Sequence, residues 1–598
     1  MLYKKLTSLP EISKAQLSKI LNHYAGSKDL VLEPMLIKPL ERICGVRWLK
    51  ANNVEKIFKL EEMIPKSDNT LFYMIYTDFG TFKQVLNQIR SKLDPENLPK
   101  DKYHIIVIPK LLYVFEDTLE ELGLSGNVIK LYSFQWQPVH LDMGIISLEI
   151  PRMYKTLYVD HDLSLLPVFA KSLWHLSFIT GKPKLYIALG QHSNAVLKHL
   201  DILYENLADT DKLDSDFGAV ILMDRNLDYP SALLTPTTYA ALLNEVYGVV
   251  CGMCEYKSTE GVDHDNKFNP VIKKEPVQFI LDSTRDSVYR DIKNRYFTEV
   301  TMVLNTLTKS LRSEGESSKE MALDEIKKYV ATQLQATTSK KKFIANHLAA
   351  AQTIVNTLGH RFEDQQQTEQ FLMQNKNKSG NYTYLEEVLV TENDRILTLR
   401  LMCLMAVTQK LSDSEMRSFW NKFYNEFGYS AGFVHNNLCK AGFLTEGSPS
   451  TTNLPNLPNI VSKLPKLLTN DFYINANKLK QIPNDPSKIN LKAPTCCSYV
   501  FGGNYIPLIS QIASMLLSNT PISDIKIKLE ALGPLTIKNE RGYPLQSRTL
   551  LLYVIGGLTY AEIAACNLLE TLTGGRIVIC SDKIISGNDI VNAVIDTS

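Results

Sequence analysis

The stretch Phe217–Gly248, FGAVILMDRNLDYPSALLTPTTYAALLNEVYG, predicts the core unit of an α/β domain. Its first part, Phe217–Met223, is a continuous apolar run, which is typical of a strand buried on both faces of a parallel sheet. Thr235 and Pro236 are the expected N-cap and first residue of a helix, because proline lacks only an N–H that would be unpaired there. The apolar spacing over Tyr239–Tyr247 predicts an amphipathic helix that stops at the final glycine.

The bulk composition predicts an ordinary globular protein with several domains. The chain has 598 residues, far more than the one or two hundred of a typical domain. Its 65 basic and 64 acidic residues leave a formal net charge of +1. A nucleic-acid-binding protein usually carries a basic excess, so the balance argues against a nucleic-acid partner.

The sequence has no stretch with the pattern of a signal peptide or a membrane span. The start, MLYKKLTSLPEISKAQLSKIL, lacks the apolar region of a signal peptide. Leu551–Leu569 comes nearest to a membrane span, but Glu562 interrupts it. The nine cysteines show no disulfide framework. We therefore expect a cytoplasmic protein with reduced cysteines, which contacts membranes through partners.

Two regions alternate strand and helix signals. In residues 1–130, the runs Leu71–Tyr76 and Tyr103–Ile108 predict buried strands of a first, small α/β domain. Residues 131–248 and 490–598 are also strand-rich, and each is too short to bury a parallel sheet alone. We expect them to form one discontinuous second α/β domain, split by a long helical insertion.

The insertion divides into two predicted parts. Residues 249–370 read as a projecting helical hairpin, whose last helix has apolar positions that include Leu348 and Val355. Its non-core positions are rich in lysine, including Lys327, Lys328 and Lys341. Such charges usually mark a solvated face, and the alternative is a docking surface for helices. Residues 371–489 predict a distal helical domain.

Three features resemble catalytic or ligand sites. The loops 501–503 (Phe-Gly-Gly) and 555–557 (Ile-Gly-Gly) lie between a predicted strand and a helix, where phosphate is often bound. Neither loop has a full nucleotide-binding pattern, so tight turns are the favoured interpretation. Asp224, Arg225 and Asp228 predict a structural salt-bridge cluster, since no catalytic partner set is visible. Cys251 and Cys254 form a single Cys-x-x-Cys pair, so no metal site or other cofactor is expected.

Several motifs together resemble the SM family, the Sec/Munc-type proteins that chaperone SNARE assembly. They are the strand ending in Asp-Arg-x-x-Asp and the helix ending in Asn-Glu-x-Tyr-Gly within residues 224–248, then residues 146–151, 399–404, 438–446, 499–508 and 556–565. The resemblance covers essentially the whole chain. It is strongest for the vacuolar-protein-sorting "thirty-three" branch of class C tethering complexes, and the motifs look closer to the metazoan B-type paralogue.

The resemblance implies an SM arch and a role without catalysis. The hairpin would bind SNARE helices, with Lys327, Lys328, Tyr329 and Lys341 as candidates. The distal domain would hold a helical-repeat tethering partner of the sixteen type. The matching positions are Lys422, Tyr429, Gly432 and Phe433, whose aromatic side chains are plausible anchors.

The family resemblance also implies action at late endosomes and lysosomes, in membrane fusion and vesicle transport. Two other classes of function stay open on the sequence. One is an α/β nucleotide-binding enzyme that uses the two glycine loops. The other is a plain scaffold that binds its tethering partner without SNAREs.

Overall fold

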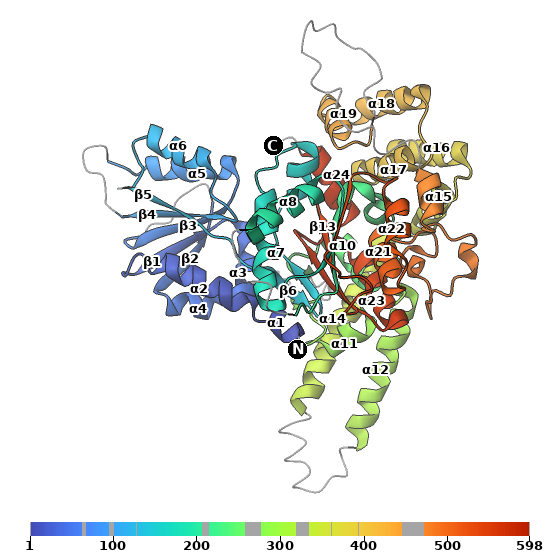
Figure 1. Ribbon diagram of the computed structural model, residues 1–598, viewed down its shortest axis with the longest axis horizontal. Helices are drawn as coiled ribbons and strands as arrows, with labels where there is room; N and C mark the ends of the chain where they lie inside the picture. The colour runs from blue at the N-terminus through green and yellow to red at the C-terminus, as the bar shows by residue number, and fades with distance from the viewer. Residues whose placement is uncertain are drawn as a thin grey trace, which may run out of the picture.

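The computed structural model contains two largely parallel sheets and a long helical insertion (Figure 1). The structure describes residues 2–61, 67–94, 101–126, 128–205, 214–256, 277–317, 334–359, 361–392, 394–444 and 472–596. The first sheet and its helices form one end of the molecule, and a pair of long helices projects from the remainder.

Five parallel strands form the first sheet. They are β1 (Lys28–Leu32), β2 (Val54–Lys59), β3 (Thr70–Tyr76), β4 (Tyr103–Ile108) and β5 (Ile129–Ser133). Their order is β2-β1-β3-β4-β5, and β3 and β4 are buried at every position, as their apolar runs predict. The helices of this part are α1 (Leu2–Leu6), α2 (Leu9–Leu21), α3 (Ile37–Ile43), α4 (Gly45–Ala51), α5 (Phe79–Arg90) and α6 (Tyr113–Glu121).

The sequence of residues 35–51 predicts one helix interrupted by Pro39, and the structure differs from this prediction. The chain forms α3 and α4, and the break lies at Cys44. Pro39 sits in the first turn of α3, where the missing N–H has no helical partner to lose.

The second sheet combines strands from two distant parts of the chain. They are β6 (Val139–Asp142), β7 (Ile145–Ser147), β8 (Leu185–Leu189), β9 (Ala219–Asp224), β12 (Leu535–Asn539), β13 (Thr549–Ile555) and β14 (Arg576–Ser581). Their order is β12-β8-β9-β13-β14-β7-β6, with antiparallel pairing at the two edges. Because β9 pairs with β13, the expected discontinuous second domain is confirmed.

The quoted stretch lies at the centre of this sheet. Strand β9 is buried at every position, and α10 (Tyr239–Tyr247) ends at Gly248, whose left-handed φ of 66° suits glycine. The expected N-cap was wrong, because α10 begins after Thr238. Thr235 instead donates hydrogen bonds from its N–H and hydroxyl to the buried Glu369 carboxylate, at 2.9 and 2.6 Å.

Helices flank the second sheet (Figure 1). Helix α7 (Leu166–Thr180) packs on α8 (Gln191–Glu205), and α23 (Tyr560–Thr573) packs on α10 and α21 (Leu508–Leu517). The others are α9 (Pro230–Leu233), α22 (Ile522–Leu529) and α24 (Gly587–Ile595).

The insertion begins with an antiparallel ribbon, β10 (Met253–Tyr256) and β11 (Val277–Ile280). Its helices are α11 (Ser287–Ile292), α12 (Phe297–Ser317), α14 (Leu334–Leu358), α15 (Arg361–Met373), α16 (Lys378–Glu387), α17 (Arg395–Thr408), α18 (Asp413–Phe427), α19 (Ser430–Lys440) and α20 (Phe472–Lys478). The apolar spacing over 288–311 predicts one long helix, but a break separates α11 from α12. The polar segment 312–318 predicts a linker after that helix, whereas residues 312–317 continue α12 and residue 318 lies outside the described residues.

The insertion is tied to the second domain by Arg400. This buried residue of α17 lies 2.8 Å from the Glu245 carboxylate at the end of α10. Ser412 followed by Glu415 three residues later is the sequence pattern that predicts a capping box, and the structure confirms this box at the start of α18.

Candidate functional site

The polar loop after β9 is a buried ion-pair cluster. Arg225 Nη1 lies 2.8 Å from both carboxylate oxygens of Glu562 on α23, and both side chains are 0% exposed. Asp228 accepts hydrogen bonds from the Tyr505 hydroxyl at 2.9 Å and the Leu508 N–H at 2.7 Å. The predicted structural cluster is therefore confirmed, and Glu562 is a partner that sequence spacing did not reveal.

Asp224, the last residue of β9, caps the neighbouring helix α8. Its carboxylate accepts the N–H groups of His192 and Ser193 at 2.8 and 2.7 Å. Gly190 allows this approach, since a Cβ there would lie 2.3 Å from the Asp224 carboxyl carbon. The polar side chains at the carboxyl end of β9 thus stabilise the fold through their contacts with neighbouring elements.

The loop 501–503 does not follow a strand, so that prediction was wrong. Residues Cys497–Phe501 form a 3₁₀ turn. The carbonyls of Tyr499 and Val500 accept hydrogen bonds from Thr237, at 2.7 and 2.9 Å, and so are tied to the loop before α10. The segment therefore lies outside the two parallel sheets.

The loop 555–557 does follow β13, but its donors are already used. The N–H groups of Gly556 and Gly557 donate to Asp582 Oδ1, at 2.9 and 3.1 Å. Burial raises the pKa of Asp582 to about 7. A side chain of the protein thus occupies the position that a phosphate would take at these two amides.

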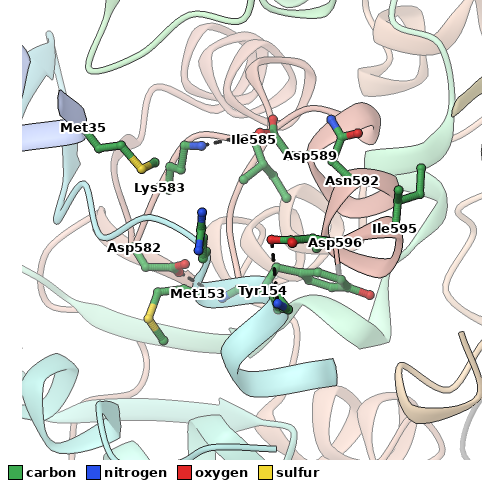
Figure 2. A pocket seen from close by; sticks show the side chains of 14 residues that line it. Met35, Met153, Tyr154, Asp582, Lys583, Ile585, Asp589, Asn592, Ile595 and Asp596 are labelled. Atoms are coloured by element: carbon green, nitrogen blue, oxygen red, sulfur yellow. Dashed lines mark hydrogen bonds and ion pairs between the residues drawn. The ribbon is translucent and has the colours of Figure 1, made fainter. Parts of the chain in front are cut away.

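A cavity of about 400 Å³ lies beside this loop, between residues 152–155, the end of β14 and α24 (Figure 2). Figure 2 shows Met35, Met153, Ile585 and Ile595 as its apolar walls. The three cations and three carboxylates that line it are Arg152, Lys155, Lys583, Asp582, Asp589 and Asp596. Lys155 pairs with Asp596 at 3.7 Å and Lys583 with Asp589 at 3.5 Å, so two of the three cations already face carboxylates of the protein.

The Cys-x-x-Cys pair is buried. Burial raises the pKa of Cys254 to about 12 and that of Cys251 well above its usual value, so neither thiol is poised to react. Within the described residues, no group of three or more His, Cys, Asp or Glu side chains could hold a metal ion.

The hairpin helices α12 and α14 project away from the body of the molecule (Figure 1). Lys341 lies exposed on α14, whereas Lys327, Lys328 and Tyr329 fall outside the described residues. The exposed positions of α14 include a row with alternating steps of four and three residues. This row, called the α14 stripe below, consists of Lys341, Ala345, Leu348, Gln352 and Val355.

The α14 stripe has the spacing of a coiled-coil seam, which packs against another helix. Leu348 is 46% exposed and Val355 is 53% exposed. Both belong to the apolar positions that predict this helix from the sequence, and such positions are usually buried. Helical periodicity finds an apolar position but does not say whether the same chain covers it, so sequence reasoning missed this surface.

The four predicted tether positions lie on α18 and around α19. Tyr429 is 98% exposed and Phe433 is 63% exposed, one turn further along the chain. Gly432 leaves room beside Tyr424, whose hydroxyl would lie 3.8 Å from a Cβ at that position. Lys422 is paired with Glu386 at 2.7 Å. The structure thus exposes two aromatic rings four residues apart in the chain, and it adds Tyr424, which the sequence did not single out.

No helix in the described part of the chain combines the length and the apolar character that crossing a bilayer requires.

The structure resembles solved proteins of one kind. The SM protein Vps45 in complex with the Qa SNARE Tlg2 gives a TM-score of 0.59 at 13% identity, over 98% of this chain and 97% of that chain. The Unc18–syntaxin 1 complex from Monosiga brevicollis gives 0.54 at 13% identity, over 98% and 99%. The predicted fold class, an SM arch, is confirmed.

Comparison of the sequence with known proteins indicates the same family as the structural likeness. Human vacuolar protein sorting-associated protein 33B is 25% identical over 98% of this chain and 96% of its own length. The 33A protein of Rattus norvegicus is 25% identical over 99% and 98%. The Sec1 family model matches residues 28–593. Because that match spans nearly the whole chain, this protein belongs to the Sec1 family, the Sec/Munc-type proteins that its motifs indicated.

Proposed function

We propose that this protein binds SNARE helices on its hairpin and promotes membrane fusion without catalysis. The observation that carries the proposal is the α14 stripe, an uncovered helix seam on a projecting element. Leu348 and Val355 expose apolar surface in seam positions, and such positions are normally buried against a second helix. An amphipathic helix with a heptad repeat, as in a SNARE motif, is the partner whose spacing fits.

The relatives support this role. Two of the similar structures are complexes, one with the SNARE Tlg2 and one with syntaxin 1. Lys341 at one end of the stripe, with Lys327, Lys328 and Tyr329 as further candidates, would favour acidic positions flanking the seam of a bound helix.

The hairpin is tested by a matched pair of variants. Leu348→Glu places a charge in the seam and should weaken binding of a SNARE-motif peptide about tenfold, which is the loss of one interface anchor. Met302→Glu is the control, because Met302 is 55% exposed on the other hairpin helix. Lys327→Glu with Lys328→Glu should also weaken binding. Equal affinity of wild type and Leu348→Glu in a titration would contradict the proposal.

We further propose that the distal helices bind a helical-repeat tethering partner of the sixteen type, within a class C complex at late endosomes and lysosomes. Tyr429 and Phe433 are large, exposed aromatic side chains four residues apart in the chain, and such residues often dominate interface energies. The names of the relatives place them in vacuolar protein sorting. In this assignment the protein is cytoplasmic, does not bind nucleic acid and reaches membranes through its partners.

The distal surface has its own test. Tyr429→Asp should release the tethering partner in a pull-down and leave the melting temperature unchanged, because the ring contacts little of its own chain. Tyr113→Asp is the control, since Tyr113 is 75% exposed on α6 of the first domain. Retention of the partner by Tyr429→Asp would remove the assignment. Partner binding without any SNARE binding would instead indicate a plain scaffold.

We propose domain boundaries that follow the same functions. They are residues 1–130, residues 131–248 with 490–598, the hairpin domain 249–370 and the distal domain 371–489. Strand β5 crosses the first boundary and pairs with β4, so its last residues belong with the first sheet.

A further inference from the structure

A buried carboxylate–imidazole–phenol chain lies where the hairpin meets the body. His347 Nε2 lies 3.0 Å from Asp286 Oδ2, and His347 Nδ1 lies 2.9 Å from the Tyr239 hydroxyl. Exposure is 0% for His347 and Tyr239 and 2% for Asp286. The arrangement resembles a catalytic relay, but no substrate reaches an imidazole that is fully buried. We therefore expect these three residues to have a structural role.

The three residues come from three different elements. Tyr239 is the first residue of α10, at the centre of the second domain, and His347 belongs to α14 of the hairpin. Asp286 is the N-cap of α11, and its Oδ1 accepts the Tyr289 N–H at 2.9 Å. One carboxylate thus fixes the start of α11 with one oxygen and holds α14 with the other.

The donors and acceptors of Tyr239, His347 and Asp286 define the direction of their hydrogen bonds. An ionised Asp286 only accepts, so His347 donates from Nε2 and accepts at Nδ1 from the Tyr239 hydroxyl. Aromatic rings enclose the imidazole: Phe279 meets it edge-on at 5.2 Å and Tyr289 stacks at 6.0 Å. Both ring nitrogens are therefore satisfied inside an otherwise apolar box, which allows His347 one orientation.

This geometry fixes how α14 is turned about its axis. The face that carries His347 also carries buried Ile344, Ala351 and Ile354, and apolar contacts alone tolerate small shifts. The hydrogen bonds of His347 do not tolerate such shifts. A slide of one residue moves a helix by about 1.5 Å and turns it by about 100°, which would break both bonds. Leu348, the neighbour of His347 in sequence, is held on the outside.

We propose that Asp286, His347 and Tyr239 form a rotational lock that keeps the α14 stripe outward, so that His347 is a positioning residue of the docking surface. The lock rests on the geometry above, and its link to binding rests on the proposed function of the hairpin. The partner positioned in this way is an amphipathic helix with a heptad seam.

The test measures which face of α14 is accessible. Cysteine is introduced at Leu348 or at Ile344, which is 6% exposed, and maleimide labelling of each site is read by peptide mass spectrometry. In the otherwise unchanged chain, Leu348→Cys should label at least about tenfold faster than Ile344→Cys, because protected sites react only on local opening. In a His347→Leu background we expect the ratio to fall to about threefold or less.

A matched control separates rotation from loss of stability. Ile354→Ala removes buried apolar volume from the same face of α14 and should lower the melting temperature while leaving the labelling ratio unchanged. If His347→Leu fails to fold, Tyr239→Phe removes the phenol bond alone and should lower the ratio by a smaller factor. An unchanged ratio in the folded lock variants would overturn the lock.

Peptide binding distinguishes the lock from the docking role. A SNARE-motif peptide should bind His347→Leu about tenfold more weakly than wild type, and Ile354→Ala as well as wild type. A collapsed labelling ratio with unchanged affinity would overturn the positioning role. A peptide that fails to bind even the wild type would refute the proposed function of the hairpin, whereas the labelling ratio would still decide whether the lock exists.

Discussion

Replacement of Glu562 by glutamine removes the charge that neutralises Arg225 inside the protein. Both side chains are 0% exposed and Arg225 Nη1 lies 2.8 Å from each Glu562 oxygen, so water cannot replace the lost carboxylate. A buried charge left without its partner typically costs about 3–5 kcal/mol. Glutamine keeps one oxygen for Arg225, and the Asp228 carboxylate remains 3.8 Å away, so we expect the low end of that range, about 3 kcal/mol. For a domain of about two hundred residues this lowers the melting temperature by about 6–12 °C.

The assay is scanning calorimetry of Glu562→Gln beside Glu530→Gln. Glu530 pairs with Lys526 at 3.5 Å on the surface, and both side chains are more than half exposed, so that loss should cost less than about 1 kcal/mol. A double variant, Arg225→Met with Glu562→Leu, should recover part of the lost stability, because it removes both members of the ion pair, while Asp228 stays buried and keeps its hydrogen bonds from Tyr505 and Leu508. Similar melting temperatures for the two single variants would refute the argument.

Three further changes test other parts of the fold. Asp582→Asn should become more stable relative to wild type by about 2–3 kcal/mol between pH 5 and pH 8, measured by urea unfolding. The pKa of Asp582 is raised to about 7 by burial, so the wild type loses stability as pH rises from its unfolded pKa through 7; a constant difference would contradict this. Gly556→Ala should cost more than about 2 kcal/mol in the same assay, because φ is +100° and a Cβ would lie 2.5 Å from the Tyr158 ring; a neutral effect would show that the loop adapts. Ser412→Ala should lower stability by about 1 kcal/mol through loss of the α18 capping box, while the exposed Ser414→Ala should not.

The sequence predicted the buried centre of each sheet well. Strand β4 has the predicted bounds, since its uninterrupted run of apolar residues is typical of a strand that is buried on both faces of a sheet. Edge strands β2, β5 and β12 were missed, because they are half exposed and mix polar with apolar residues.

The candidate sites could be predicted only in part. Tyr429 and Phe433 were named from a family resemblance, and the structure shows them exposed. The stripe residues Leu348 and Val355 have the spacing of core residues in the sequence, because periodicity cannot reveal whether a helical face is exposed. Glu562, the partner of Arg225, is 337 positions away, and spacing carries no information about such contacts.

The interleaving of β9 with β13 also bears on how the protein is made. Strand β9 ends at Asp224, and the strand that covers its open side begins at Thr549. During synthesis, β9 therefore has an unpaired edge and five consecutive apolar residues while more than three hundred further residues emerge, which is a template for aggregation. A chain that stops before Thr549 would lose two central strands rather than a terminal appendage. Premature termination late in the message should thus be as damaging to the second domain as termination near its start.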